Sequence, residues 1–184
     1  MIALYIALGI VGFLLFLWFV FEFNKFIKLK NAVDKELSNM DVFFKKRYDL
    51  VPNLVNTVKG YMKHEQNLIT EVTEARASVS PNSKGEKRAR AEARLGGAVD
   101  NLFAVAENYP DLKANTVFLD LQNQLAGLER EIAGAREQYN SVATDFNTKR
   151  ESFPSSIVAF LMGLRKRTLF KARRRERKNV KVKF

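Results

Sequence analysis

The chain has 184 residues, enough for one domain of ordinary size together with a membrane anchor. It contains no cysteine, which excludes disulfides and thiolate metal sites, and its nine glycines and four prolines favour long helices over a turn-rich β fold. Its formal charge of +11 is concentrated in residues 165–184, which hold eleven basic residues and one acidic residue, whereas the rest of the chain has 20 Lys and Arg against 19 Asp and Glu.

Residues 2–21 form a run of twenty residues without a charged side chain. As a helix this run would be roughly 30 Å long, which matches the hydrocarbon core of a bilayer. A cleaved signal peptide and a buried core helix are the alternatives. The length of the run, the absence of a preceding basic residue and the lack of a small-residue cleavage site favour a retained anchor. We predict that residues 1–22 are a transmembrane anchor.

The flanking charges predict the orientation of this anchor. No side-chain cation precedes the run, whereas Lys25, Lys28, Lys30 and Lys35 follow it. The positive-inside rule therefore predicts a single-pass protein of the cell membrane with its N-terminus outside and residues 22–184 in the cytoplasm.

The next segment carries apolar residues at helical spacing, interrupted once. The apolar positions of this first seam are Val33, Leu37, Met40, Phe44, Val51, Val55, Val58, Met62, Ile69, Val72 and Val79. Two successive steps of four residues occur around Pro52, which either kinks one long helix or separates two antiparallel helices. Because Asp49–Pro52 would make a poor reversing loop, the pattern favours the kink.

A polar turn at residues 80–85 precedes a helix predicted from about Glu86 to Glu107. Gly96 and Gly97 lie within it. They indicate either a close backbone approach at a helix crossing or a hinge, since each glycine weakens an isolated helix. Residues 108–111 end this helix in a turn.

The clearest periodicity predicts one helix from Asn115 to Phe153, with Asn115 as its N-cap and Pro154 ending it. Its apolar seam alternates steps of three and four, as in a coiled coil. The positions are Phe118, Leu121, Leu125, Leu128, Ile132, Ala135, Tyr139, Val142 and Phe146. We therefore predict an all-α fold: residues 1–22 as transmembrane helix, residues 23–153 as an antiparallel bundle of three or four long helices, and residues 154–184 as a short apolar segment with a basic tail.

No residue pattern indicates catalysis. The single histidine, His64, has no cysteine or second histidine to complete a common zinc site, and neither a phosphate-binding glycine loop nor a nucleophile elbow is present. We predict no catalytic residues, no metal and no cofactor.

Three charged residues, Arg47, Glu65 and Arg76, fall on the first seam. Charges at such positions set helix register or pair across helices, and the long arginine stems can lie along the seam with their heads in water. The alternative is that these three residues contact a protein partner.

The basic tail is expected to contact anionic lipid, since the anchor already holds the chain at a membrane. Binding of nucleic acid and a solvated segment without a ligand are the alternatives. The preceding apolar run, residues 157–164, either lies in the membrane interface or caps the bundle. The proposed lipid-contacting residues are Arg165, Lys166, Arg167, Lys171, Arg173, Arg174, Arg175, Arg177 and Lys178.

Several long motifs resemble the LemA family over roughly residues 24–163. They are KRYDLVPNLV at 46–55, TVKGYMKHE at 57–65, TEAR at 73–76, AVAENYPDLKAN at 104–115, YN at 139–140, FN at 146–147 and FPS at 153–155. The resemblance implies a bacterial membrane protein with an N-terminal anchor, a helical bundle and no established enzymatic activity.

A further similarity, carried by Phe153-Pro154, Ala159-Phe160 and Gly163, is to the MamQ-like magnetosome branch of this family and implies a role in organelle membrane formation. The basic tail departs from the acidic or mixed ends more usual in the family. Together these features favour a non-enzymatic membrane scaffold or adaptor that binds a protein partner or a second copy of itself. The alternatives are an accessory subunit of a membrane enzyme or transporter and a nucleic-acid tether.

Overall fold

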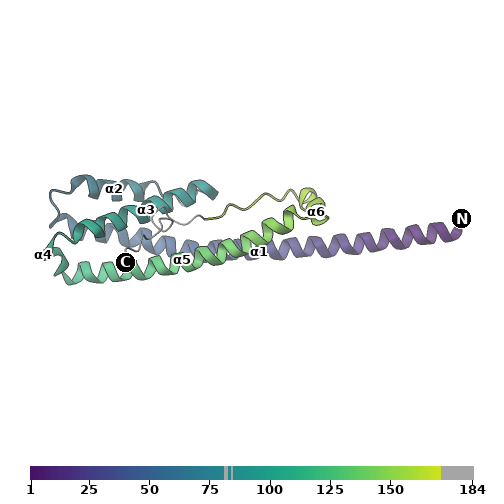
Figure 1. The fold of residues 1–184 in the computed structure, drawn as a ribbon, viewed down its shortest axis with the longest axis horizontal. Coiled ribbons are helices and arrows are strands. Elements are labelled where there is room, and N and C mark those ends of the chain that lie inside the picture. The colour runs from purple at the N-terminus through teal and green to yellow at the C-terminus, as the bar shows by residue number, and fades with distance from the viewer. Residues whose placement is uncertain (81–82, 84, 171–184) are drawn as a thin grey trace, which may run out of the picture. The chain divides into compact units, whose positions relative to one another are not determined.

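The computed structural model describes residues 1–80, 83 and 85–170. These residues form helices and no strand, which confirms the all-α prediction (Figure 1). The helices are α1 (Ile2–Lys59), α2 (Gln66–Ala77), α3 (Gly85–Ala106), α4 (Pro110–Lys113), α5 (Thr116–Glu151) and α6 (Ser155–Leu161). Two compact units share them: residues 1–38 with 138–167, here called the anchor unit, and residues 39–137 with 168–170, here called the bundle unit.

The first part of α1, up to Leu17, is strongly apolar and is not covered by any other part of the described chain. Every residue from Met1 to Leu17 is exposed, and α1 is the one helix of the described chain long and apolar enough to cross a membrane. Trp18 and Phe19 are the first residues of the run to be partly covered, and Glu22 is buried. A membrane span needs apolar side chains toward lipid and a backbone whose polar groups bond within the segment, and this part of α1 meets both needs.

The chain does not reverse at Pro52, because α1 continues through it to Lys59. The reversal lies at residues 60–65, where the sequence pattern had predicted a continuing helix, and that part of the prediction is wrong. The N–H groups of Tyr61 and Met62 both bond to the carbonyl oxygen of Val58, at 3.0 and 2.9 Å, in the turn that follows the end of α1 at Lys59. The Met62 side chain is fully buried although it lies outside a helix, so its spacing mimicked a helical seam.

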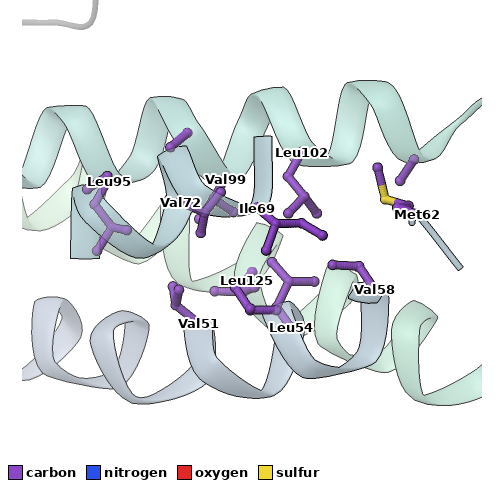
Figure 2. Packing of buried hydrophobic residues seen from close by; sticks show 14 of the residues in the cluster. Val51, Leu54, Val58, Met62, Ile69, Val72, Leu95, Val99, Leu102 and Leu125 are labelled. Atoms are coloured by element: carbon purple, nitrogen blue, oxygen red, sulfur yellow. The ribbon is translucent and has the colours of Figure 1, made fainter. Parts of the chain in front are cut away.

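The core of the bundle unit is apolar and is shared by α1, α2, α3 and α5. Figure 2 shows this cluster, in which side chains of α1 meet side chains of α2 and α5. The labelled members from these helices are Val51, Leu54 and Val58 of α1, Ile69 and Val72 of α2, and Leu125 of α5. Leu95, Val99 and Leu102 of α3 complete this layer. Burial of such side chains is the main favourable term in the stability of a bundle.

The helix α3 begins and ends within one residue of its predicted bounds. Gly85 starts it with a φ of +59°, a left-handed conformation that favours glycine. The preceding turn was predicted at residues 80–85, of which 81, 82 and 84 lie outside the described residues. The close approach expected at the glycine pair is absent at Gly97, where an added Cβ would meet nothing within 4 Å.

The helix α5 confirms its predicted cap and nearly all of its seam. The Asn115 side-chain oxygen accepts a hydrogen bond from the backbone N–H of Phe118 at 3.0 Å, and the helix stops at Glu151, shortly before Pro154. Val142 was predicted on the seam but is only half-buried, and Ala143 is buried in its place. A 3.6-residue helix drifts against a strict heptad, and a step of four at this point corrects the drift.

In the anchor unit, the last turns of α5 pack against α1 and bond to the start of α6. The Phe26 and Phe146 rings meet edge to face with centroids 6.3 Å apart. The Lys149 ammonium lies 2.7 Å from the Glu22 carboxylate, and the Ser155 hydroxyl donates to the carbonyl oxygen of Lys149 at 2.8 Å. These contacts hold the start of α6 close to the residue at which α1 leaves its apolar run.

Candidate functional site

A cluster of charged residues lies inside the bundle unit, centred on Arg47 of α1. Its guanidinium is fully buried and bonds to the Glu92 carboxylate of α3 and the Glu129 carboxylate of α5, each at 2.6 Å. A second bond, of 2.9 Å, runs from the guanidinium to the carbonyl oxygen of Glu92. Since a buried charge is costly unless it is paired and hydrogen-bonded, these contacts make Arg47 tolerable in the core and join three helices.

Arg88 extends this cluster toward solvent. Its guanidinium lies 3.1 Å from Glu92, which is one turn along α3, and 3.1 Å from the Asp41 carboxylate of α1. The Glu92 side chain is 1% exposed, and it therefore lies between two arginines with almost no water. This arrangement pairs the buried arginine charge within the bundle and leaves the Glu92 carboxylate closed to a substrate.

Arginines also surround the buried Phe44 ring of the bundle unit. The guanidinium carbons of Arg47, Arg88 and Arg136 lie 5.5, 5.7 and 5.8 Å from its centroid. The centroid of the Phe170 ring lies 6.1 Å from the centroid of the Phe44 ring. Cation–π attraction strengthens when the cation is desolvated, so Phe44 helps to stabilise Arg47 and Arg88, which the carboxylates also hold.

Arg76 of α2 compensates for the proline inside α1. Pro52 has no N–H, so the carbonyl oxygen of Tyr48, four residues earlier, loses its usual helical donor. The Arg76 Nε donates to that oxygen at 3.0 Å, and the guanidinium stacks on the Tyr48 ring at 3.8 Å. Arg76 thereby ties α2 to the point where α1 lacks a backbone bond, which explains how the helix continues through Pro52.

The remaining motif residues join the turns at one end of the bundle unit. The Tyr109 hydroxyl donates to the Glu65 carboxylate at 3.1 Å, and the Asn115 amide donates to the Tyr61 hydroxyl at 3.0 Å. Desolvation and the Glu65 carboxylate together raise the pKa of Tyr109 above its ordinary value. Glu65 and Arg76 are half-buried and His64 is exposed. Whether Arg47, Glu65 or Arg76 also contacts a partner stays a prediction, although every contact of buried Arg47 described here is internal.

The described part of the tail is partly engaged within the anchor unit. Arg167 lies 2.9 Å from the Asp34 carboxylate, and Lys166 lies 2.9 Å from Glu151, whose pKa is lowered by this hydrogen bond. Arg165 is exposed. The other proposed lipid-contacting residues lie outside the described residues: Lys171, Arg173, Arg174, Arg175, Arg177 and Lys178.

An open groove that the sequence analysis missed lies between α1 and α5 in the bundle unit. It has a volume of about 780 Å³. Phe43, Leu50 and Leu128 provide apolar lining, and Lys46 and Glu131 are among the charged residues on it. The off-seam apolar residues Phe43 and Leu50, one heptad apart, are the sequence signal that would have located this groove.

The exposed apolar run of α1 and the internally paired bundle define a membrane-associated helical bundle with a single candidate span in its described residues. The chain belongs to the LemA family, whose pattern matches residues 36–184.

Relatives of this chain come from several bacteria. The chain is 27% identical over 162 residues to Protein LemA of Metamycoplasma hominis, covering 85% of this chain and 72% of the relative. It is 22% identical over 190 residues to Magnetosome protein MamQ 2 of Paramagnetospirillum magneticum, covering 89% and 69%. It is also 20% identical over 186 residues to Magnetosome protein MamQ of Magnetospirillum gryphiswaldense, covering 87% and 68%.

The buried charge cluster yields a stability prediction. Glu92→Gln removes the fully buried charge that Arg47 and Arg88 share, and we expect it to lower the free energy of unfolding by about 3 kcal/mol, because each arginine keeps only a more exposed carboxylate partner. Urea unfolding of the detergent-solubilised chain, followed by circular dichroism, measures this loss.

The matched control lies on the same helix. Glu86→Gln breaks an ion pair with Arg90 in which both side chains are more than 60% exposed, and we expect a change within about 0.5 kcal/mol. Equal losses in the two variants would contradict the role assigned to the buried cluster.

Proposed function

We propose that this protein is a non-enzymatic, membrane-anchored scaffold or adaptor. The observation that carries the proposal is the continuity of α1, which holds the exposed apolar run at one end and supplies core residues of the bundle at the other. An anchor and a core that share one helix are suited to fixing a bundle to a membrane. We keep residues 1–22, 23–153 and 154–184 as the anchor, the bundle, and the apolar segment with its tail.

The charge chemistry of the bundle supports the absence of catalysis in this proposal. Arg47 and Arg88 both pair with Glu92, whose side chain is 1% exposed, so this carboxylate is closed to a substrate. In the described residues, no three His, Asp or Glu side chains gather as a metal site. The names of the relatives denote no catalytic activity.

The orientation that we propose places the bundle in the cytoplasm. Lys25, Lys28 and Lys30 are exposed and follow the apolar run on its bundle side. Basic residues next to a span favour the cytoplasmic side of a bacterial membrane.

A labelling experiment tests this orientation, and the cysteine-free chain makes it specific. We expect Val117→Cys, whose parent side chain is 58% exposed in the bundle unit, to resist a membrane-impermeant maleimide in intact cells and to react after permeabilisation. Ile2→Cys, at the other end of the run, is the control and should react in intact cells. The reverse pattern would show that the bundle faces outward.

The basic tail, residues 165–184, is proposed to hold the bundle against anionic phospholipid. Each cation near an anionic surface contributes about 1 kcal/mol, so eleven basic residues can bind strongly even when some are engaged elsewhere.

Flotation with vesicles tests the tail. A chain lacking residues 1–22 should float with vesicles that contain phosphatidylglycerol and remain behind with pure phosphatidylcholine, and removal of residues 165–184 should abolish the difference. Equal flotation with both vesicles would contradict lipid contact by the tail. Salt-sensitive DNA binding that depends on the same residues would favour the nucleic-acid tether instead.

The groove between α1 and α5 is the proposed binding site for a partner protein, because it combines apolar lining with charged residues of both signs. A photo-crosslinking residue at Asn123, which lines the groove, should give one adduct of defined mass in cells. The same residue at exposed Glu71 of α2 is the control and should give none.

The mass of the adduct separates the candidates. A stoichiometric enzyme or transporter would make the chain an accessory subunit, and twice the mass of the chain would show a homo-oligomer. The absence of an adduct from Asn123, or equal adducts from both positions, would contradict a partner site in the groove.

The magnetosome relatives favour a second candidate, in which the same scaffold serves an internal organelle membrane. Fractionation of the cell envelope from internal membranes distinguishes this role from one at the cell membrane.

A further inference from the structure

The short helix α6 carries an exposed apolar surface, here called the α6 apolar face. Three of its residues, Ile157, Phe160 and Leu161, follow the spacing of one side of a helix, and Phe153 precedes them in the turn. The side chains are strongly exposed: Ile157 by 51%, Phe160 by 84%, Leu161 by 67% and Phe153 by 83%. The other side of α6 is buried through Ser155, Val158 and Ala159, so the exposed face is not the one that holds α6 to the protein.

The anchor unit places this face close to the end of the apolar run. The Ser155 hydroxyl donates to the carbonyl oxygen of Lys149, and the Lys149 ammonium pairs with Glu22, the first charged residue after the run. Figure 1 shows α6 at the end of α5. The α6 apolar face therefore lies near the level at which α1 leaves the hydrocarbon.

The charges around this level suit a lipid boundary. Lys149 and Glu22 are 22% and 10% exposed and neutralise each other, so neither brings an unpaired charge to the edge of the hydrocarbon. Lys25, Lys28 and Arg165 are exposed in the same unit, where phosphate groups of lipids would attract them.

From this arrangement we propose that α6 and the Phe153 turn insert into the boundary between headgroups and acyl chains, as a second membrane contact beside the span. The inference rests on the membrane anchorage proposed above, but it does not depend on the tail or on orientation. A protein partner is less suited to the face, since four side chains provide less than the roughly 800 Å² that each side of a stable interface buries.

The experiment uses the full-length chain in liposomes of phosphatidylcholine and phosphatidylglycerol at a low protein-to-lipid ratio. Phe160→Cys carries an environment-sensitive fluorophore, and Val117→Cys in the bundle unit carries the same fluorophore as the control. We expect emission from position 160 at shorter wavelength, quenching by lipids brominated near the glycerol, and loss of quenching by aqueous iodide. Position 117 should show the opposite pattern.

A second reporter keeps the test independent of position 160. With the fluorophore at Ile157→Cys, the double substitution Phe153→Ser and Phe160→Ser should restore quenching by iodide, whereas Val42→Ser, at a side chain 54% exposed in the bundle unit, should leave it unchanged. Circular dichroism confirms that each variant remains folded.

Two results would overturn the inference. In the first, iodide quenches positions 160 and 117 equally while flotation shows that the chain is still embedded, which separates a failure of the α6 contact from a failure of the anchor. In the second, the wavelength shift appears only at high protein-to-lipid ratio, which identifies a second copy of the chain as the occupant.

Discussion

The bundle unit depends on one buried ion pair and its extensions. Arg47 of α1 meets carboxylates from α3 and α5, so a single guanidinium fixes the register of three helices whose apolar seams alone would allow sliding by a turn. The guanidinium groups of Arg47 and Arg88 also lie over the buried Phe44 ring, whose π face attracts both cations. A strict geometry results, because a guanidinium shifted by one turn would lose both carboxylates at once.

The motifs that characterise the family have structural roles in this chain. Arg47 pairs across helices, Arg76 supplies the hydrogen bond that Pro52 removes from α1, and Tyr109 and Asn115 join the turns. Polar residues that hold a fold together also leave its outer surfaces free to differ between relatives. This division is compatible with relatives as different in name as LemA of a mycoplasma and a magnetosome protein.

Much of the fold was predictable because long helices show a regular spacing of apolar residues in the sequence. The apolar seam of α5 and its Asn115 cap were predicted correctly, except that Val142 is not buried. This position was assigned wrongly because a helix of 3.6 residues per turn drifts against a strict heptad. The turn after Lys59 was missed because Met62 is buried at helical spacing without being helical. The carboxylate partners of Arg47 were also beyond the sequence, since their sequence positions lie 45 and 82 residues away. The hydrogen bond of Arg76 was missed for a different reason. Its acceptor is the backbone carbonyl oxygen of Tyr48, which lacks its helical donor because Pro52 has no N–H.

The Glu22–Lys149 pair has a consequence for bilayers of unequal thickness. It joins α1 to α5, and moving it into hydrocarbon would require dragging a second helix and two partly desolvated charges along. The bundle side of the span is therefore a fixed edge, whereas residues 1–17 pack against nothing in the structure. In the anchored protein that we propose, we therefore expect hydrophobic mismatch to be accommodated by tilting or by local adjustment at the opposite leaflet, with the depth of the bundle side unchanged.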